Sequence, residues 1–385
     1  MINEKKTKLS VILPCLNEEE AIEVCLKSLS IVLSSVDYGV EVIVVDNNSD
    51  DNSLDMIKNR SHLFSNLKIV TENNRGYGYA YLSGLKEARG DYIYMADMDN
   101  TYDFGDIPRF VERLDLGADM VIGNRFTKSL KRGSMSFSHR YIGNPVLSSL
   151  VRTFFNVRVK DVHCGARAFK TNILPILDLK TGGMEFASEM IIKAAKVGIT
   201  IDQIDIVYNP RIGESKLKSI RDGWRHLRFI LLYSSLATFF IPGLFIFLSG
   251  LLLFLWFLIG NPQIFGINFY IHPLFFFSLL LILGYQIILF GFFAKIYAIN
   301  HLGDSDKLIQ KLFKSFNLEK GVLAGLTFSL IGITIFFVIF FNWVSQDFPA
   351  MERTKISILA LTLFIIGAQT FFASFMLSML GIKKK

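Results

Sequence analysis

Short apolar runs alternate with segments of helical periodicity over about the first 230 residues. The apolar runs predict strands at Leu9–Leu13, Val40–Val45, Leu67–Thr71 and Tyr92–Ala96. The segments between them predict helices at Glu18–Leu33, Asn52–Asn59 and Gly78–Ala88. We expect Pro14 to end the first strand, because proline has no backbone N–H to donate. Strands that are apolar on both faces and alternate with helices are typical of an α/β domain with a mostly parallel sheet.

Beyond about residue 230 the chain changes to long, nearly uncharged apolar runs. Runs long enough to cross a bilayer as helices lie at roughly 235–259, 272–298, 321–344 and 355–381. A soluble core rarely needs four buried helices of this length. We therefore expect a soluble domain at 1–215, a juxtamembrane segment at 216–234 and an all-α membrane domain at 235–385. Within the second part, Lys218 to Leu232 is Arg-rich and partly amphipathic, which is typical of a helix at the bilayer surface.

Positive charges flank the apolar runs unequally. They precede the first run (Arg221, Arg225, Arg228), separate the second from the third (Lys307, Lys311, Lys314, Lys320) and end the chain (Lys383, Lys384, Lys385). The loop near 260–271 has no Lys or Arg, whereas the last outer turn carries Arg353 and Lys355. The positive-inside rule predicts that the soluble domain, the middle loop and the C-terminus are cytoplasmic. We expect no signal peptide before Leu9, because the first apolar run has only about six residues.

Composition narrows the classes of function. The net charge of +7 is mostly juxtamembrane, where it would meet anionic lipid headgroups. A nucleic-acid partner is not favoured, because the soluble half lacks a basic stripe with interleaved aromatic side chains. Cys15, Cys25 and Cys164 have neither metal-ligand spacing nor a disulfide framework, so we interpret them as ordinary thiols in a reducing compartment.

Polar loops follow three of the predicted strands, at Pro14–Glu18, Asp46–Asp51 and Asp97–Asp103. Ligands of parallel sheets bind beyond the carboxyl ends of the strands, so these loops should meet at one edge. Asp97 and Asp99, in DYIYMADMDNTYD, stand where carboxylates can hold a divalent cation that neutralises a diphosphate. Asp-x-Asp also occurs by chance in many loops, and Asp-Asn-Asn-Ser is ordinary turn and cap chemistry. The residues alone therefore leave both interpretations open.

An ordered set of motifs carries a resemblance to a known family: PCLNEE, VVDNNSDD, NRGYGYAYLSGL, ADMDN, GNR, DVHCGARAF and RIGESK. From about residue 8 to about 230 the chain resembles a family 2 glycosyltransferase of the GT-A fold. Within that family it is similar to the dolichyl-phosphate and polyprenyl-phosphate sugar synthases that carry C-terminal membrane helices. The resemblance implies a nucleotide-sugar-binding domain and a nucleotide-sugar donor.

The resemblance also implies a donor site. By the family pattern its residues are Pro14, Leu16, Glu18, Asp46, Asn47, Gly76, Asp97, Met98 and Asp99. Leu16 stands where many relatives have an aromatic residue. Gly76 precedes a predicted helix and allows the backbone to approach a phosphate closely. Taken alone, Glu18 equally fits a carboxylate at a helix N-terminus.

ADMDN matches the metal-binding signature of the family, with Asp97 towards the nucleotide and Asp99 towards the cation. Mg²⁺ or Mn²⁺ suits a site made of carboxylate and phosphate oxygens. Relatives often have Gln where this chain has Thr101. The Thr101 hydroxyl is therefore expected to be a weaker or water-mediated ligand.

Basic residues are implied at the donor diphosphate and the acceptor phosphate. Arg125 follows an apolar strand at Met120–Ile122, and Arg211 and Lys216 lie in RIGESK, one residue closer together than in some relatives. A guanidinium suits phosphate because it stays charged and donates in a fork. An exposed Arg or Lys is nevertheless more often solvated surface.

Asp161, in DVHCGARAF, is implied as an active-site carboxylate near the acceptor. Many inverting glycosyltransferases need a base to deprotonate a hydroxyl, but a lipid monophosphate is already largely ionised. Asp161 is therefore either a base or a group that orients the nucleophile. His163 has no metal-ligand spacing and is interpreted as structural. Glu185 and Glu189 either belong to a family helix near the acceptor or form the polar face of an ordinary helix.

The implied reaction is a direct displacement at the cytoplasmic face of the bilayer. A sugar passes from a GDP-mannose or UDP-glucose type donor to polyprenyl or dolichyl phosphate, with inversion of the anomeric configuration. Relatives with four spans suggest a homo-oligomer such as a tetramer. A processive polysaccharide synthase is one alternative, although its usual Gln-x-x-Arg-Trp motif is absent from the sequence. A non-catalytic lipid-handling protein is another. Intact aspartates, and spans whose inner charge is limited to Lys295, disfavour it.

Overall fold

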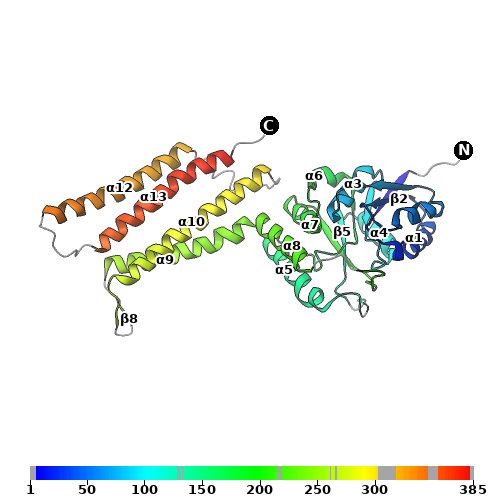
Figure 1. Cartoon of the computed structure of the whole chain (residues 1–385), viewed down its shortest axis with the longest axis horizontal. Coiled ribbons are helices and arrows are strands. Elements are labelled where there is room, and N and C mark those ends of the chain that lie inside the picture. Colours follow the sequence, from blue (N-terminus) through cyan, green and yellow to red (C-terminus); the bar gives the residue numbers. More distant parts are fainter. Residues whose placement is uncertain are drawn as a thin grey trace. The chain divides into compact units, whose positions relative to one another are not determined.

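The chain divides into two compact units, Met1–Ile230 and Leu231–Lys385 (Figure 1). The computed structural model describes residues 6–127, 131, 133–214, 219–260, 262–264, 267–301, 318–345 and 354–381. Several basic residues of the sequence analysis lie outside the described residues: Lys216, Lys307, Lys311, Lys314, Arg353, Lys383, Lys384 and Lys385.

The first unit contains a seven-stranded sheet in the order β3-β2-β1-β4-β6-β5-β7. Its strands are β1 (Thr7–Cys15), β2 (Gly39–Asp46), β3 (Leu67–Thr71), β4 (Tyr92–Met95), β5 (Met120–Asn124), β6 (Arg167–Lys170) and β7 (Ile201–Asp205). Neighbouring strands are parallel except where β6 pairs antiparallel with β4 and β5. Because β2, β1 and β4 are neighbours and run the same way, the loops that follow them leave the sheet at one edge.

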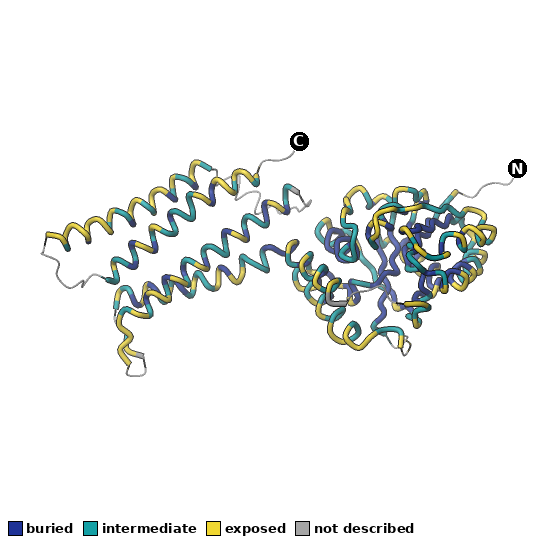
Figure 2. Tube along the Cα trace, in the orientation of Figure 1, coloured by how far each residue is buried: buried dark blue, intermediate teal, exposed yellow. Residues whose placement is uncertain are grey.

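The helices of the first unit lie between or after these strands, and the last of them continues past Ile230 into the second unit. They are α1 (Glu19–Ser34), α2 (Ser53–Asn59), α3 (Tyr77–Glu87), α4 (Ile107–Asp115), α5 (Asn144–Phe155), α6 (Leu174–Leu177), α7 (Phe186–Lys196) and α8 (Ser219–Tyr233). Short turns η1 (Ser61–Leu63), η2 (Phe104–Asp106) and η4 (Thr171–Ile173) are 3₁₀ helices, and η3 (His139–Gly143) is a π-helix that leads into α5. Figure 2 shows the buried residues of this unit concentrated in its strands. The central strands therefore form the core that holds the loops in place.

Pro14 does not end the first strand as predicted, because β1 continues to Cys15. Ile12 accepts a hydrogen bond from Ala96 on the β4 side, and Pro14 faces the same side two residues later. The pairing with β4 has ended there, at Ile12 and Met95. The missing N–H of Pro14 therefore removes no bond from a continuing ladder, and the pairing of Pro14 with Val45 of β2 is kept.

The second unit is built from long helices. It contains η5 (Leu236–Phe240), α9 (Ile241–Ile259), a short hairpin of β8 (Gln263–Ile264) and β9 (Ile267–Asn268), α10 (His272–His301), α12 (Leu318–Ser345) and α13 (Thr354–Leu380). Four segments of the described residues are long and apolar enough to cross a membrane: Leu236–Ile259, His272–Asn300, Leu318–Ser345 and Thr354–Leu380. At about 1.5 Å per residue each exceeds the roughly 30 Å hydrocarbon core of a bilayer.

Small residues let α12 and α13 pack closely. A Cβ atom added to Gly325 would lie 2.6 Å from the backbone nitrogen of Phe371, and one added to Gly332 would lie 2.6 Å from the carbonyl oxygen of Ala360. Such close contact between backbones drives helix association inside membranes, where the hydrophobic effect cannot.

Polar side chains join α10 to α13. The hydroxyls of Ser278 and Thr362 lie 2.7 Å apart, and those of Tyr285 and Thr370 lie 2.6 Å apart. Each pairing satisfies polar groups that lipid could not, so this seam fixes which faces of the two helices meet.

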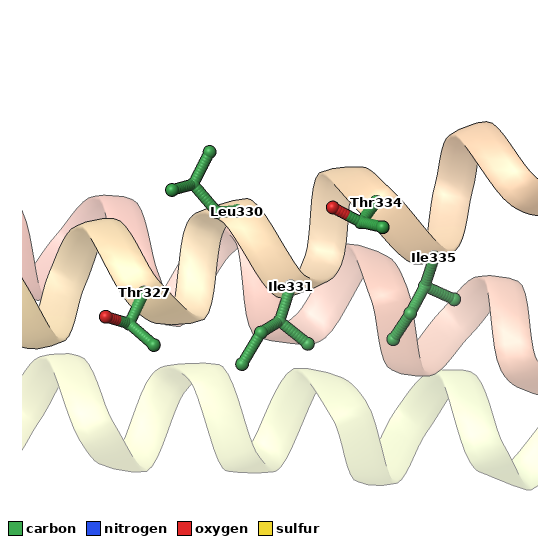
Figure 3. Close-up of a pocket in the computed structure, with 5 residues that line it drawn as sticks. All are labelled: Thr327, Leu330, Ile331, Thr334 and Ile335. Carbon is green, nitrogen blue, oxygen red and sulfur yellow. The ribbon is translucent and has the colours of Figure 1, made fainter.

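Most of the apolar surface of these helices is not covered by the chain itself. Only 17% of the most apolar stretch of α12 is buried, which leaves the rest for lipid. Figure 3 shows a shallow hollow on α12, where Thr327, Ile331 and Ile335 point to the same side of the helix.

The four long apolar helices make the protein an integral membrane protein. The predicted fold class is confirmed: an α/β domain with a mostly parallel sheet, followed by four long apolar helices.

Candidate active site

Three loops meet at the edge formed by the carboxyl ends of β1, β2 and β4, which we call the donor edge. Each places an asparagine in the left-handed region of backbone space: Asn17 (φ 53°), Asn48 (φ 62°) and Asn100 (φ 64°). Residues other than glycine seldom adopt this conformation, and it often accompanies functional loops. Asn17 Oδ1 accepts from the N–H of Asp50 at 2.7 Å, which ties the first two loops together.

Asp97 and Asp99 lie in the loop after β4. Tyr81 donates its hydroxyl proton to Asp97 Oδ1 at 3.2 Å. Thr101 donates twice to Asp99 Oδ1, from its backbone N–H at 3.0 Å and from its hydroxyl at 2.5 Å. The Thr101 hydroxyl, predicted as a weak ligand, thus orients the predicted ligand Asp99. Burial, with the neighbouring charge of Asp99, raises the pKa of Asp97 to about 7.

This pair of carboxylates fits a hard divalent cation such as Mg²⁺ or Mn²⁺, which prefers oxygen ligands and would relieve the repulsion between them. Within the part of the chain that the structure describes, no group of three or more His, Cys, Asp or Glu side chains could hold a metal ion. Asp97 and Asp99 would therefore supply only part of a coordination shell. Phosphate oxygens of a nucleotide are suited to supply the rest.

Arg211 joins two of the loops of the donor edge. Its Nη1 donates to Asp99 Oδ2 at 3.0 Å, and its Nη2 donates to Glu18 Oε1. Glu18 stands one residue before α1, where the Ser53 hydroxyl accepts from its backbone N–H at 2.8 Å. The Glu18 carboxylate is thus held by an arginine, in addition to lying at the N-terminus of a helix. Arg211 and Glu18 are 193 residues apart in the sequence, so only the fold brings them together.

The segment around Arg211 is attached to the loop after β4 by its backbone. Ile212 donates its N–H to the carbonyl of Asp99 at 3.0 Å, and Asn209 donates to the carbonyl of Thr101 at 2.9 Å. Tyr102 and Tyr208 form a β-bridge, and their rings pack edge to face with centroids 5.4 Å apart. The guanidinium of Arg211 is therefore delivered to Asp99 by a fixed backbone.

Asp46 and Asn47 organise the loop after β2. Asp46 Oδ1 accepts from the N–H of Ser49 at 3.3 Å. Asn47 Oδ1 accepts from the N–H of Gly76 at 2.7 Å, while its Nδ2 donates to the carbonyls of Glu72 and Asn74 at 3.2 and 2.8 Å. The Asn47 amide, implied as part of the donor site, holds the β3–α3 loop in this structure.

Gly76 and Gly78 allow the start of α3 to approach another backbone. A Cβ atom on Gly76 would lie 2.3 Å from the carbonyl oxygen of Gly182, and one on Gly78 would lie 2.1 Å from that of Thr181. Tyr79 donates its N–H to the same carbonyl of Gly182 at 3.2 Å. The sequence suggested that the backbone at Gly76 approaches a phosphate. In the structure it approaches the backbone of Thr181 and Gly182 instead.

Arg125 and Asp161 form a buried pair. Arg125 donates from Nε to Asp161 Oδ2 at 2.7 Å, from Nη2 to Oδ1 at 2.9 Å and from its backbone N–H at 3.2 Å. Burial opposes the charge of Arg125, but Asp161 raises its pKa well above the usual value. Both oxygens of the Asp161 carboxylate therefore accept from the Arg125 guanidinium.

Residues 161–166, which we call the Asp161 loop, are anchored by groups to which the sequence assigned no role. Arg167 is fully buried and donates to three carbonyls, those of Val162, Cys164 and Ala187. Its charge is thus satisfied by backbone oxygens from the loop and α7.

A short chain of hydrogen bonds runs from this loop to α8. His163 Nε2 lies 3.0 Å from the Ser188 hydroxyl, which lies 2.8 Å from His226 Nδ1. Burial lowers the pKa of both histidines, to about 4 for His226. Both rings are therefore neutral at physiological pH, which agrees with a structural role for His163. Polar residues at 163, 188 and 226 are widely separated, so the sequence carried no signal for this contact.

The other predicted residues have varied places. Pro14 and Leu16 are half-buried at the end of β1, whereas Met98 is 1% exposed and packs its side chain in the core. Glu189 is buried and accepts from the N–H groups of Lys180 and Thr181, so its carboxylate holds the segment before α7. The three cysteines are free and buried, and burial raises the pKa of each thiol to about 12.

Two family models and several known proteins match this chain. Residues 10–175 match Glycosyl transferase family 2, and residues 292–381 match the Glycosyltransferase family 2 C-terminal transmembrane region. The chain is 34% identical over 376 residues to the low-salt glycan biosynthesis hexosyltransferase Agl6 of Haloferax volcanii, an alignment that covers 97% of this chain and 89% of that protein.

Two further relatives are more distant. A dolichol-phosphate mannosyltransferase of Pyrococcus furiosus is 27% identical over 269 residues, covering 66% of this chain and 74% of that protein. The crystal structure of glucosyl-3-phosphoglycerate synthase from Mycobacterium tuberculosis with Mn²⁺, UDP-glucose and phosphoglyceric acid aligns with a TM-score of 0.48 and 21% identity, covering 59% of this chain and 80% of that one. With its catalytic domain and its membrane region both matched, the chain belongs to glycosyltransferase family 2 and is a glycosyltransferase.

Proposed function

We propose that the protein transfers a hexose from a nucleotide sugar, of the GDP-mannose or UDP-glucose type, to a polyprenyl or dolichyl phosphate. The observation that carries this proposal is the meeting of Glu18, Asp99 and Arg211 at the donor edge of a chain that also has membrane-spanning helices. The names of two relatives, a hexosyltransferase and a dolichol-phosphate mannosyltransferase, support it.

The donor half of the reaction needs a diphosphate to leave. Asp97 and Asp99 would hold a Mg²⁺ or Mn²⁺ ion, which neutralises the diphosphate when bound. Arg211 adds a permanent positive charge near the diphosphate, and we assign Lys216 the same role. Glu18 and Asp46 offer carboxylates to ribose hydroxyls or the base edge at the neighbouring strand ends.

The acceptor half needs an oxygen nucleophile placed behind the anomeric carbon. An oxygen of the lipid phosphate forms the new bond while the bond to the nucleoside diphosphate breaks, which inverts the anomeric configuration. This nucleophile is already ionised, so no strong base is required. The Arg125–Asp161 pair would then orient the acceptor phosphate and keep its charge in place.

Surfaces of the catalytic unit fit a lipid acceptor. Phe137, Tyr141, Ile142 and Val146 expose an apolar face along η3 and α5, with Phe137 73% exposed. Aromatic and aliphatic side chains beside Arg140 are typical of segments that lie at a bilayer surface. α8, which precedes the first span in the sequence, also carries Arg residues of the kind found at a bilayer surface. The positive-inside rule supports a cytoplasmic catalytic unit.

The test is to incubate full-length protein with short-chain polyprenyl phosphate, Mn²⁺ and, in turn, GDP-mannose, UDP-glucose and UDP-N-acetylglucosamine, with products followed by mass spectrometry. Asp99→Asn and an acceptor alcohol without phosphate are the matched controls. One hexosyl-phosphate lipid that disappears in both controls is the expected result. Repeated sugar addition would indicate a processive synthase. No lipid product, with equal nucleotide release by wild type and variant, would overturn the proposal.

Sidedness needs its own measurement. Because the three natural cysteines are buried, Ser35→Cys at the exposed end of α1 gives a single reactive thiol. We expect a membrane-impermeant maleimide to label it in inverted vesicles and not in intact cells. Labelling of intact cells would contradict a cytoplasmic catalytic unit.

A further inference from the structure

Arg211 holds the oxygen of Asp99 that a cation would need. Asp99 Oδ1 already accepts two hydrogen bonds from Thr101, at 3.0 and 2.5 Å. The other oxygen, Oδ2, accepts from Arg211 Nη1 at 3.0 Å. Asp99 is buried, and these three hydrogen bonds leave one lone pair of its carboxylate, on Oδ2, for a cation. A dication that bound Oδ2 would lie directly beside the guanidinium, and like charges at such separation repel strongly.

Arg211 is also incompletely satisfied where it lies. Its two terminal nitrogens donate to Asp99 and Glu18, but Nε is buried and has no hydrogen-bond partner among the described residues. A buried donor without an acceptor is costly, so the guanidinium gains from any position that offers more acceptors. The oxygens of a diphosphate offer several acceptors in a geometry that matches the guanidinium fork.

The backbone beneath Arg211 allows its side chain to move while the loop stays in place. Hydrogen bonds from Ile212 to Asp99 and from Asn209 to Thr101 fix the chain on both sides of Arg211. A change of side-chain rotamer therefore moves the guanidinium from one partner to another without unfolding the segment.

We propose that Arg211 and the divalent cation of the donor alternate on Asp99. Arg211 neutralises Asp99 and Glu18 until the cation arrives with the diphosphate, then yields Oδ2 to the cation and transfers its fork to the diphosphate oxygens. The cation alone binds weakly against Arg211, whereas the cation and diphosphate bind well together. This inference rests on the proposed donor site, and by linkage each ligand strengthens the other to the same extent.

The test is to measure Mn²⁺ binding to the full-length protein by electron paramagnetic resonance, first without nucleotide and then with GDP or UDP. We compare wild type with Arg211→Gln and Arg211→Lys. Arg75→Gln is the matched control, because Arg75 adds a positive charge to the same edge through Asp50 and the Asn48 carbonyl. We expect Arg211→Gln to bind Mn²⁺ alone about tenfold more tightly than wild type, within the usual range of coupling between sites. Arg75→Gln should change this affinity much less.

The nucleoside diphosphate gives a second readout. It should raise the Mn²⁺ affinity of the wild type and raise that of Arg211→Gln by a smaller factor. Equal Mn²⁺ affinity in wild type and Arg211→Gln, or equal gains in Arg211→Gln and Arg75→Gln, would overturn the inference. Arg211→Lys keeps the charge and should bind Mn²⁺ alone as weakly as wild type. It lacks the fork, so nucleoside diphosphate should raise its Mn²⁺ affinity by a smaller factor than in wild type, and an equal gain would overturn the inference even if the Gln variant fails to fold.

Asp99→Asn separates this inference from the proposed function. Loss of Mn²⁺ binding in Asp99→Asn, together with unchanged affinity in Arg211→Gln, would refute the alternation and leave the donor site intact. Full Mn²⁺ binding in Asp99→Asn would refute the donor site itself, whatever the Arg211 variants show.

Discussion

The donor edge and the Asp161 loop differ in the ratio of carboxylates to guanidinium groups. At the donor edge three carboxylates, Glu18, Asp97 and Asp99, gather around the guanidinium of Arg211. At the Asp161 loop, the Asp161 carboxylate pairs with a single guanidinium, that of Arg125, through two hydrogen bonds. The donor edge thus carries excess negative charge and suits an added cation. The Arg125–Asp161 pair is balanced without any ligand and suits a fixed scaffold.

Removing a carboxylate from the donor edge should affect catalysis most. We expect Asp99→Asn to lower kcat/KM by about 10³-fold or more, which corresponds to about 4 kcal/mol of transition-state stabilisation. Arg211 keeps Glu18 as a partner and is partly exposed, so the thermal unfolding midpoint should fall less than in Asp161→Asn. Initial rates of lipid product and a melting curve test both parts. A variant as active as wild type would show that Asp99 holds no catalytic cation.

Removing a carboxylate from the Asp161 loop should affect stability as well. Asp161→Asn leaves the charge of Arg125 buried without a partner, and breaking one half of a buried pair costs about 3–5 kcal/mol. The unfolding midpoint in denaturant measures this loss.

A double variant checks the cause of that loss. Arg125→Met with Asp161→Asn removes both charges and should regain most of the stability while activity stays low. If Asp161→Asn is as stable as wild type, the two regions do not differ in the way described.

Much of the fold follows from local patterns. Leu67–Thr71 is a strand with the predicted limits because its apolar run is bounded by polar residues on both sides. Arg167–Lys170 and Ile201–Asp205 also form strands, yet neither has an alternating or continuous apolar pattern. The first of these is held in the sheet by neighbours on both sides, β4 and β5, and tertiary pairing overrides weak local preference.

The site was less predictable than the fold. Parallel topology explains why the loops with Glu18 and Asp99 should converge, and the structure brings them together. The partners within the site depend on contacts between distant segments: Arg125 was expected at a phosphate and pairs with Asp161, and Arg211 reaches Glu18 across most of the catalytic unit. No periodicity encodes such pairings, so they required the structure.

Acid should weaken the packing between the Asp161 loop and α8 through His226. Its folded pKa of about 4 lies below the unfolded value of about 6.5, because the ring is buried and Arg167 is near. The unfolded chain therefore binds the proton first, and the stability due to neutral His226 is fully present above about pH 6.5 and is lost as pH falls towards 4. Between pH 6.5 and 5 this loss is about 2 kcal/mol.

Melting curves of the full-length protein at pH 7.5, 6.5, 5.5 and 5.0 measure this dependence. His226→Gln is the matched variant, because its amide can still bond to Ser188 but does not titrate. Its unfolding midpoint should fall less between pH 6.5 and 5 than that of wild type. Parallel curves for the two proteins would place the acid sensitivity elsewhere.

Thr101 gives the smallest expected effect, because it orients the Asp99 carboxylate by hydrogen bonds and carries no charge. Thr101→Val keeps the shape and the backbone N–H bond to Asp99 but removes the hydroxyl bond at 2.5 Å. One hydrogen bond to a charged group contributes about 1.5 kcal/mol, so we expect kcat/KM to fall about tenfold. Thr101→Ser keeps the hydroxyl and should retain most of the activity. If the hydroxyl were instead a direct cation ligand, Thr101→Val would lower Mn²⁺ affinity and the rate together, and extra Mn²⁺ would restore the rate. A loss that excess Mn²⁺ leaves unchanged would show that Thr101 acts by orienting Asp99.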